Sequence, residues 1–551
     1  IHELLRQYAH ERLAHTPDEL AHSRQLHATY FINFLAEHSP ALKGPGHLGA
    51  VTALRHDQDN VRVAWQWACV HQQFALLQQA LDGLCLYYHF RGQTDTGIES
   101  CQQLAALIRR TEFDAEEKYR LLLARTLLWQ GIFSRDQGTI DVAEQLWGQS
   151  AQLLDKLPAT TPTVRQTYAE LSLQQGIAAV RACEYAQAHT HYALAEQLLR
   201  ALDNRWELGK VLLEHGLVYW HWNRYDEGRR LCAEGMEIFQ DLSDQTGVSD
   251  AWMGIGLCAS GQGQLDVAEE ALRHCVDVAE RGSANRIYVM TARNILGWVL
   301  ALAGKFSEAL AVTDSVIEFA DRVGNRYWAS MYRWTRGLVQ LNLGIYAAAR
   351  ARLTEGLALA QAIDYRRGTG CILMVQAWLA MVDEDFSTAE KMLLESIPLM
   401  REIGHADELA QSLASLAIIK LMQGETTAAW PYLLEGLTTA RASGAYLALI
   451  TCLPATALAA AATGQPNTAL RLHHVALNEA YYGKSRWYAD VFYPRLIDAT
   501  MTLTPEEQEV ARSEAALLTP AMAIEDVLTK LETPVDASIR AAGEWPQEVQ
   551  S

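Results

Sequence analysis

The amino-acid sequence predicts an all-helical solenoid in which pairs of helices repeat about every 40 residues. Three observations support this prediction. Small side chains recur in one register along most of the chain, good helix formers dominate the composition, and glycines stand where helices should end. With 551 residues, half of them hydrophobic, the chain is a folded protein too long for one ordinary globular core, so it needs several domains or a repeat array.

The repeat is clearest when the chain is aligned on the residue before each expected second helix. These alignment residues lie 40 or 41 positions apart: Tyr185, Tyr225, Leu265, Phe306, Tyr346, Phe386, Thr426 and Pro466. A small residue follows three positions later and another seven positions after that, except that Val316 is large. A third small residue stands twelve positions before the first: Gly176, Gly216, Gly256, Gly297, Gly337, Ala377, Ala417 and Ala457.

Glycine inside a helix needs a compensating contact, because it costs about 1 kcal/mol relative to alanine. Since five successive expected helices carry glycine at the same place, we expect close helix–helix packing that a side chain would block. Large residues such as Leu353 should fill the remaining gaps, and Gly324, Gly404 and Gly444 should end second helices in a left-handed conformation.

The 12-then-7 spacing of small residues resembles the tetratricopeptide repeat (TPR). Two further copies precede it, one well kept at Gly131, Ala143 and Ser150 and one weaker at Cys85, Gly97 and Leu104. We therefore predict a TPR superhelical solenoid of about ten repeats over residues 72–482, a helical linker over 1–71, and capping helices with a tail over 483–551. HEAT and armadillo repeats have a similar period, but the triple small-residue register favours TPR.

Several segments resemble landmarks of the STAND class of signal-transduction ATPases. Residues 1–13 are similar to the end of the winged-helix segment of that class, and the remaining matches are 28–31, 59–65, 87–92 and 517–528. The resemblance implies a linker that follows a winged-helix segment. No G-x-x-x-x-G-K-[ST] loop occurs in the sequence, so the ATPase core and any output domain are expected to precede Ile1 or to lie elsewhere outside this chain.

Composition argues against several other functions. A net charge of −19 and a pI near 5.4 disfavour nucleic-acid binding, which needs concentrated Lys and Arg. Nine scattered cysteines without a C-x-x-C pair indicate a reducing, cytoplasmic setting. The uncharged run 445–463 is mostly Ala and Thr with Pro454 in its middle, so we do not expect a membrane span. His10 and His15 are five apart and diverge on a helix; no metal site, cofactor or catalytic group is expected.

The candidate binding residues lie on three consecutive first helices. In TPR proteins the concave groove is lined by first-helix residues near the small residue of the Gly176 to Ala457 series. Here the residues three before and one after that small residue include Asn294, Trp298, Trp334, Met374 and Trp378. Large aromatic side chains make a plausible ligand surface. The alternative is that they pack between neighbouring first helices.

Two arginines depart from the apolar pattern of the repeat. Arg333 and Arg293 occupy a site that holds Leu or Trp in the other repeats, and such departures concentrate at functional sites. The alternative is that each arginine forms local salt bridges to acidic residues of a second helix.

The resemblance to the STAND class implies a ligand- or inducer-sensing, autoinhibitory domain, and no catalytic constellation in the sequence indicates an enzyme. A protein, peptide or small-molecule inducer would occupy the groove, and an upstream nucleotide-binding domain would be the partner in cis. A stand-alone TPR scaffold or adaptor is the alternative, and a helper domain of a fused enzyme is a third possibility. The Lys and Asn residues that clamp a peptide carboxylate in some TPR adaptors are absent from the matching sites. At the C-terminal end, Thr504, Pro505 and Glu507 predict a capped helix from about 505, with another from about 520.

Overall fold

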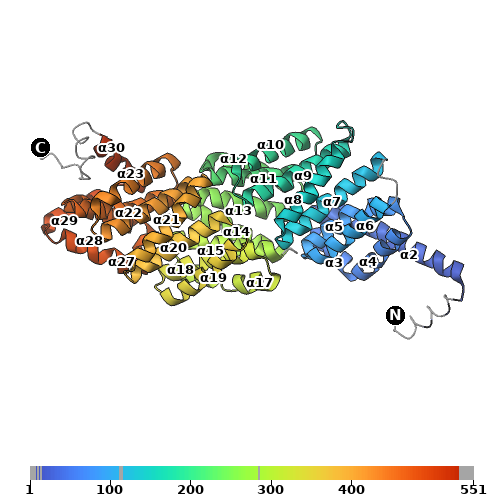
Figure 1. Cartoon of the computed structure of the whole chain (residues 1–551), viewed down its shortest axis with the longest axis horizontal. Helices are drawn as coiled ribbons and strands as arrows, with labels where there is room; N and C mark the ends of the chain where they lie inside the picture. The colour runs from blue at the N-terminus through green and yellow to red at the C-terminus, as the bar shows by residue number, and fades with distance from the viewer. Residues whose placement is uncertain (1–7, 9–11, 13–14, 111–115, 283–285, 533–551) are drawn as a thin grey trace.

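The computed structural model describes residues 8, 12, 15–110, 116–282 and 286–532. It is an elongated stack of helices with residues 17–38 at one end and residues 505–532 at the other (Figure 1). All regular elements in these residues are α-helices, apart from one short 3₁₀ turn. Most of the 1–13 stretch that resembles a winged-helix segment lies outside the described residues.

The first part of the chain forms short helices followed by two helix pairs. Its elements are α2 (Pro17–His38), η1 (Pro40–Leu42), α3 (His47–His56), α4 (Gln58–Val70), α5 (Phe74–Arg91), α6 (Thr94–Arg110), α7 (Glu117–Gln137) and α8 (Ile140–Leu154). They share a core that runs from Ala28 to Leu146.

Eight helix pairs follow with the predicted period. Their first helices are α9 (Pro162–Arg181), α11 (Arg205–His221), α13 (Gln245–Gly261), α15 (Arg286–Leu302), α18 (Arg326–Asn342), α20 (Arg366–Val382), α22 (Ala406–Met422) and α24 (Tyr446–Ala462). Their second helices are α10 (Tyr185–Ala201), α12 (Tyr225–Asp241), α14 (Leu265–Gly282), α16 (Phe306–Val312) with α17 (Val316–Val323), α19 (Tyr346–Gln361), α21 (Phe386–Glu402), α23 (Thr426–Ser443) and α25 (Pro466–Asn478). The fold is therefore the predicted TPR-type helical solenoid.

The alignment residues are displaced by one position from the prediction. Each is the first residue of its second helix and not the residue before it. The repeat with the large Val316 also differs, because its second helix breaks between α16 and α17 at residues 313–315. Val316 is fully buried at the start of α17, so the chain has made room for the larger side chain by interrupting the helix.

Close packing explains the glycines inside the first helices. A Cβ atom added at Gly337 would lie 2.6 Å from Leu353 Cγ, and one added at Gly256 would lie 2.8 Å from Leu272 Cγ. These distances are far below van der Waals contact, so a side chain would push the two helices of the pair apart. The predicted left-handed residues are also confirmed, since Gly324, Gly404 and Gly444 have φ values of 74°, 69° and 62°.

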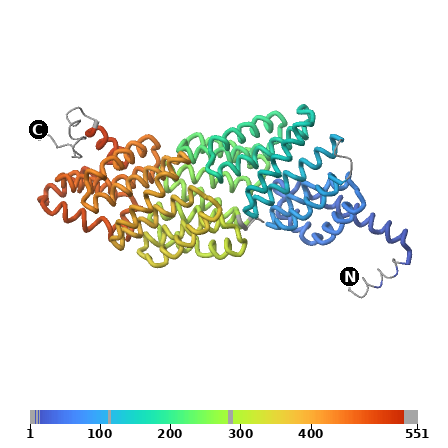
Figure 2. Tube along the Cα trace, viewed as in Figure 1, coloured from blue at the N-terminus to red at the C-terminus, as the bar shows by residue number. Residues whose placement is uncertain are grey.

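Successive turns of the superhelix touch one another, which the repeat register alone does not predict. Arg366 Nη2 donates to the carbonyl of Ala182 at 2.7 Å, and Asn325 Nδ2 donates to that of Asp136 at 3.3 Å. The paired residues are 184 and 189 positions apart in sequence, so one superhelical turn takes between four and five repeats. The trace in Figure 2 shows the resulting compact rod. The contacts form a seam between turns and narrow the space inside the superhelix.

Five shorter helices follow the last pair: α26 (Ala480–Gly483), α27 (Arg486–Val491), α28 (Tyr493–Thr500), α29 (Pro505–Ala515) and α30 (Pro520–Glu532). The predicted cap at Thr504 is confirmed, because its hydroxyl accepts from the Glu507 amide and the Glu507 carboxylate accepts from the Thr504 amide. None of the described helices combines the length and the apolar character needed to cross a membrane.

Candidate functional site: the inner surface of the superhelix

The inner surface is formed by the first helices of the repeats, and its middle part holds three of the predicted residues. Asn294 and Trp298 come from α15 and Trp334 from α18. Asn294 is buried and the two tryptophans are partly buried against the core. The ring of Trp298 meets that of Trp220 on α11 edge to face, with centroids 6.4 Å apart. The structure therefore groups Trp298 with a tryptophan that is two repeats away in sequence.

Polar atoms in this middle part lack partners. Within the described residues, Asn294 Oδ1, Trp298 Nε1 and Trp334 Nε1 are buried without a hydrogen bond. Gln340 Oε1, six residues after Trp334 on α18, is also buried without a hydrogen bond. A buried donor or acceptor without a partner costs about 1–3 kcal/mol, so such groups are rare in native proteins. Three of them on α15 and α18 belong to predicted site residues.

Arg333 has a different role from the one its sequence position suggested. Its guanidinium contacts Asp321 of α17 at 2.8 Å and Glu355 of α19 at 3.0 Å, so it is paired with second helices. Arg293 similarly donates from Nε to Glu280 at 2.8 Å and from Nη1 to Ser315. Both arginines thus follow the local salt-bridge alternative, and neither supplies a free cation to the inner surface.

Met374 and Trp378 are covered by the chain itself. Both are 3% exposed. Trp378 donates from Nε1 to Ser415 Oγ at 2.8 Å, and its ring stacks on Trp487 of α27 with centroids 5.0 Å apart. Trp487 in turn donates to the carbonyl of Trp378 at 3.0 Å. Trp378 is therefore covered by Trp487 of α27, whereas Met374 is buried where Ser412 Oγ donates to its sulfur at 3.6 Å.

The covering element, residues 480–493, is called the aromatic segment below. It packs α26 against α15 and α27 against both α18 and α20. Its buried rings are Tyr481, Tyr482, Trp487, Tyr488 and Phe492. Ser485 Oγ donates to Asn342 Oδ1 at 2.7 Å, and Asn342 Nδ2 donates to Tyr481 at 3.3 Å. Most of this stretch, from residue 483 onward, was predicted to belong to the capping helices. The many aromatic residues after 480 are the feature of the sequence that indicates a buried segment.

The inner surface nearer the N-terminus is charged. Arg125, Glu170, Lys210 and Asp250 stand on α7, α9, α11 and α13, in matching places of successive repeats. We call these four residues the charge ladder; they alternate in sign at intervals of 45, 40 and 40 residues. This alternation of charge is visible in the sequence once the first helices are aligned on their small residues.

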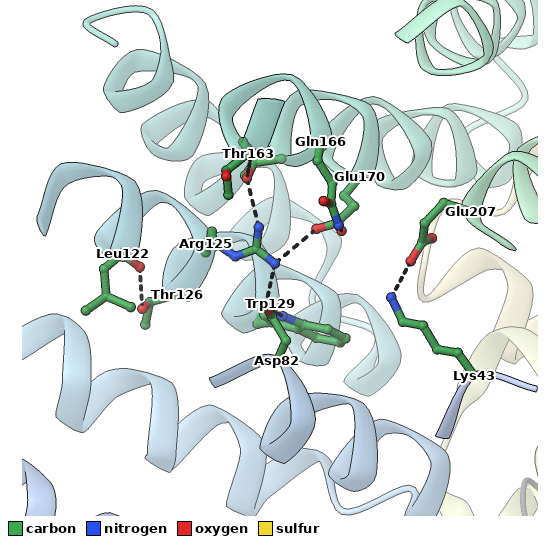
Figure 3. Close-up of polar contacts among 11 residues, drawn as sticks. Lys43, Asp82, Leu122, Arg125, Thr126, Trp129, Thr163, Gln166, Glu170 and Glu207 are labelled. Atoms are coloured by element: carbon green, nitrogen blue, oxygen red, sulfur yellow. Dashed lines mark hydrogen bonds and ion pairs between the residues drawn. The ribbon is translucent and has the colours of Figure 1, made fainter. Parts of the chain in front are cut away.

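Figure 3 shows the first rungs of the ladder and their neighbours. Arg125 Nη2 lies 2.5 Å from Asp82 Oδ2 and 3.9 Å from Glu170 Oε2, and Trp129 donates to Asp82 at 3.0 Å. Beside them, Lys43 donates to Glu207 at 2.7 Å and thereby ties the loop after η1 to α11. The cluster holds the N-terminal helices against the repeats by ion pairs.

Burial and charge compete in setting the pKa values of this cluster. Burial raises the pKa of Asp82, but the Arg125 guanidinium outweighs it and holds that pKa below its usual value. For Glu170, burial dominates over Arg125, with further help from Glu207 and Asp82, and the pKa is raised. Farther along the ladder, burial raises the pKa of Asp250 to about 7. Glu170 and Asp250, the two carboxyls of the ladder, therefore take up protons more readily than ordinary carboxyls do.

A buried histidine cluster lies on the seam between turns. His221 Nδ1 and His405 Nε2 are 3.3 Å apart, although 184 residues separate them in sequence. His405 Nδ1 contacts the Glu408 carboxylate, to which Arg367 donates from Nε at 3.0 Å. Burial, followed by the charge of Arg367, lowers the pKa of both histidines well below the ordinary value. The lowered pKa values favour the neutral imidazoles, and in that form one ring can donate to the other.

Comparisons with known proteins found similarity over part of the chain. No model of a known protein family matches it. It is similar to the HTH-type transcriptional regulator MalT of Vibrio parahaemolyticus serotype O3:K6, with 24% identity over 286 residues, or 48% of this chain and 30% of that protein. The regulator of the same description from Vibrio campbellii gives 24% identity over 288 residues with the same coverage. The chain thus matches less than a third of the length of either relative.

Among solved structures, similar chains include a Rap protein complexed with competence and sporulation factor and the apo quorum sensor NprR from B. thuringiensis. The Rap protein has a TM-score of 0.43 and 13% identity, covering 60% of this chain and 98% of its own. NprR has a TM-score of 0.43 and 15% identity, covering 68% of this chain and 96% of its own. Because both TM-scores are below 0.5, the fold assignment rests on the repeat register and on the observed helix pairs.

Proposed function

We propose that this chain is the inducer-sensing region of a STAND-type signal-transduction regulator, and that the inducer binds on the inner surface between α11, α15 and α18. The observation that carries the proposal is the group of buried, unpartnered polar atoms on Asn294, Trp298 and Trp334. A ligand that formed hydrogen bonds with these groups would offset the desolvation penalty of burying them.

The proposed contacts differ in detail from the sequence prediction. Trp298, with Trp220 beside it, offers aromatic surface, while Asn294 and Trp334 offer an acceptor and a donor. These groups suit a ligand with a flat apolar face and hydrogen-bonding edges. Of the remaining predicted site residues, Arg333 pairs with Asp321 and Glu355 of second helices, Trp378 stacks on Trp487 of the aromatic segment, and Met374 is buried beside Ser412.

The regulatory part of the proposal rests on similarity. The chain resembles the STAND class at several segments, and MalT, a transcriptional regulator, aligns with about half of it. A nucleotide-binding domain in cis would then be restrained by the solenoid until inducer arrives. Inducer can shift such an equilibrium only by binding the active form more tightly than the restrained form. Because of the net charge of −19, we propose no nucleic-acid contact for this chain, and its nine scattered cysteines favour the reducing cytoplasm.

The alternative function is a protein-binding scaffold, and ligand size distinguishes the two. The test is to measure thermal unfolding of the 551-residue chain with a protein-free, low-molecular-mass extract of the source organism. We expect a component of the extract to raise the unfolding temperature, because ligand binding stabilises the folded state. The rise in unfolding temperature should be smaller in the Trp298→Phe and Trp334→Phe variants, which keep an aromatic ring but lose the indole N–H donor.

Trp252→Phe is the matched control, because its ring packs on His274 of the second helix α14, with centroids 5.6 Å apart. It should respond as the wild type does. The groove assignment fails if the double variant Trp298→Phe/Trp334→Phe keeps the full shift. Sensing of a small molecule fails if no fraction of the extract changes the unfolding temperature while protein partners bind.

A further inference from the structure

The last turn of the solenoid shows an inverted helix. In α29 the buried residues are Ala511 and Ala515, which are 4% and 0% exposed and face α25. The larger apolar residues point the other way, since Val510 is 57% exposed and Leu517, just after the helix, is 79% exposed. A helix that packs only for its own fold would bury valine and leucine and expose alanine.

This arrangement is unusual for the end of a repeat array. Terminal repeats need a polar outer face to remain soluble, because no neighbour covers them. Here two more large apolar residues are exposed nearby, Met501 at 74% and Met522 at 52%. A stretch of 22 residues therefore carries four exposed large apolar side chains at the place where the array should be most polar.

The exposed residues of α29 form one continuous face. A shallow groove runs along it, lined by Glu506, Glu509, Val510, Ser513, Glu514 and Leu517. Val510 lies on α29 and Leu517 lies in the turn just after it, and both line the groove. The groove therefore offers two apolar side chains along its length to one helix laid in it.

Charge selects the kind of helix. Residues 504–532 contain seven acidic and two basic side chains, a net charge of −5 out of −19 for the whole chain. Within the groove, Glu506, Glu509 and Glu514 flank the two apolar residues. Arg512 pairs with Glu509 at 3.0 Å, and Arg471 approaches Glu514 at 3.5 Å, so the acidic flank is only partly neutralised. A second copy of this chain would bring like charges together, which disfavours self-association through this face.

We propose that the outward face of α29 is a docking surface for a basic amphipathic helix of a partner protein. Apolar residues of that helix at heptad spacing would cover Val510 and Leu517, and its lysines or arginines would face Glu506, Glu509 and Glu514. The surface lies on the outside of the last turn and is independent of the inner site proposed for the inducer.

The test uses two synthetic 21-residue helices, a length of about three heptads that lets several apolar contacts form side by side. Both have leucine at the apolar heptad positions, and the flanking positions hold lysine in one and glutamate in the other. Binding to the whole chain is measured by fluorescence anisotropy. The lysine helix should bind and the glutamate helix should not. Val510→Ser/Leu517→Ser should weaken binding about tenfold or more, because these residues supply the centre of the contact.

Leu394→Ser is the matched control, because Leu394 is an exposed leucine of α21 at 48% exposure and lies far along the chain from this face. It should bind the lysine helix as the wild type does. The proposal is overturned if the lysine helix does not bind, or if it binds Val510→Ser/Leu517→Ser as well as the wild type, which would mean attraction by charge alone. Sedimentation that shows dimers lost in Val510→Ser/Leu517→Ser would assign the face to a second copy and also overturn the proposal.

Discussion

The inner surface of this solenoid has two halves that are built in opposite ways from the same repeat. Toward the N-terminus, α7, α9, α11 and α13 carry the charge ladder, whose side chains are partly exposed and in which Arg125 lies 3.9 Å from Glu170. Toward the C-terminus, α20 carries Trp378, and the chain folds its own aromatic segment over this ring. Between the two halves lie Asn294, Trp298 and Trp334, each with a buried polar atom that has no hydrogen bond within the described residues.

The difference shows what an inner solenoid surface requires. Charged side chains can line a narrow, hydrated space if each finds a counter-charge, whereas large apolar side chains there must be covered, at about 25 cal/mol per Å². Trp487 and Trp378 meet this requirement within one molecule. The middle part is the least completely covered, because Trp298 and Trp334 are only partly buried, and for this reason we propose that the inducer binds there.

The largest effect should come from uncovering the apolar half. Trp487→Ala removes a ring that is 2% exposed and its stacking on Trp378, so it should lower the free energy of unfolding by about 3–5 kcal/mol. Urea unfolding followed by circular dichroism measures this. Tyr493→Ala, at a site 47% exposed in the neighbouring helix, should cost far less. Equal losses in both variants would mean that the segment is not a specific cover.

Removing the Arg125 cation should destabilise the charged half of the inner surface. Arg125→Met leaves Asp82 and Glu170 without their main counter-charge and should cost about 2 kcal/mol, below the 3–5 typical of a fully buried pair because Asp82 is half exposed. Arg229→Met, whose partner Asp226 lies 3.4 Å away on the surface, should change stability by less than about 0.5 kcal/mol. The comparison is made by chemical denaturation at pH 7.

Glu170→Gln sharpens the same comparison because its sign is opposite. The folded-state pKa of Glu170 is raised, so the charged form costs stability above that pKa, and the carboxyl favours the fold only at lower pH. At pH 7 the amide should therefore be neutral or slightly stabilising. A loss as large as that of Arg125→Met would show instead that Glu170 is a needed counter-ion.

The seam should respond to pH. The folded-state pKa values of His221 and His405 are depressed, so their contribution is present above the ordinary pKa near 6.5 and is lost as pH falls toward the folded values. Each can lower stability by at most about 1.4 kcal/mol per pH unit. Burial raises the pKa of Asp407 to about 6, which acts in the opposite direction. His405→Gln should flatten the loss between pH 7 and 5, measured against the wild type; an unchanged slope would contradict the assignment.

Much of the fold could be predicted because its signals are local. The glycine and alanine register follows from contact within one helix pair, and the cap at Thr504 and Glu507 is written in four consecutive residues. The break at Val316 was visible as a violated pattern, although its consequence, an interrupted helix, was not.

The state of the site could not be predicted because its determinants are distant in sequence. Trp378 is closed by Trp487, 109 residues later, and His221 meets His405 through the pitch of the superhelix. No repeat carries information about which residue lies one turn away. Arg333 shows the reverse case, since its partners Asp321 and Glu355 are near in sequence and the salt-bridge alternative could be named in advance.

The smallest effect on stability should come from the middle part, and there a near-zero result is informative. Trp334→Phe keeps most of the ring and removes an Nε1 donor that is buried without a partner. Losing that donor removes a desolvation cost of about 1–3 kcal/mol, while the smaller ring loses packing of similar size, so the two terms should nearly cancel. Trp378→Phe removes a donor that bonds to Ser415 and alters the ring that stacks on Trp487, so it should be clearly destabilising in the same assay. If the two variants lose equal stability, the Trp334 donor is satisfied in the ligand-free protein and the middle part loses its distinction from the aromatic half.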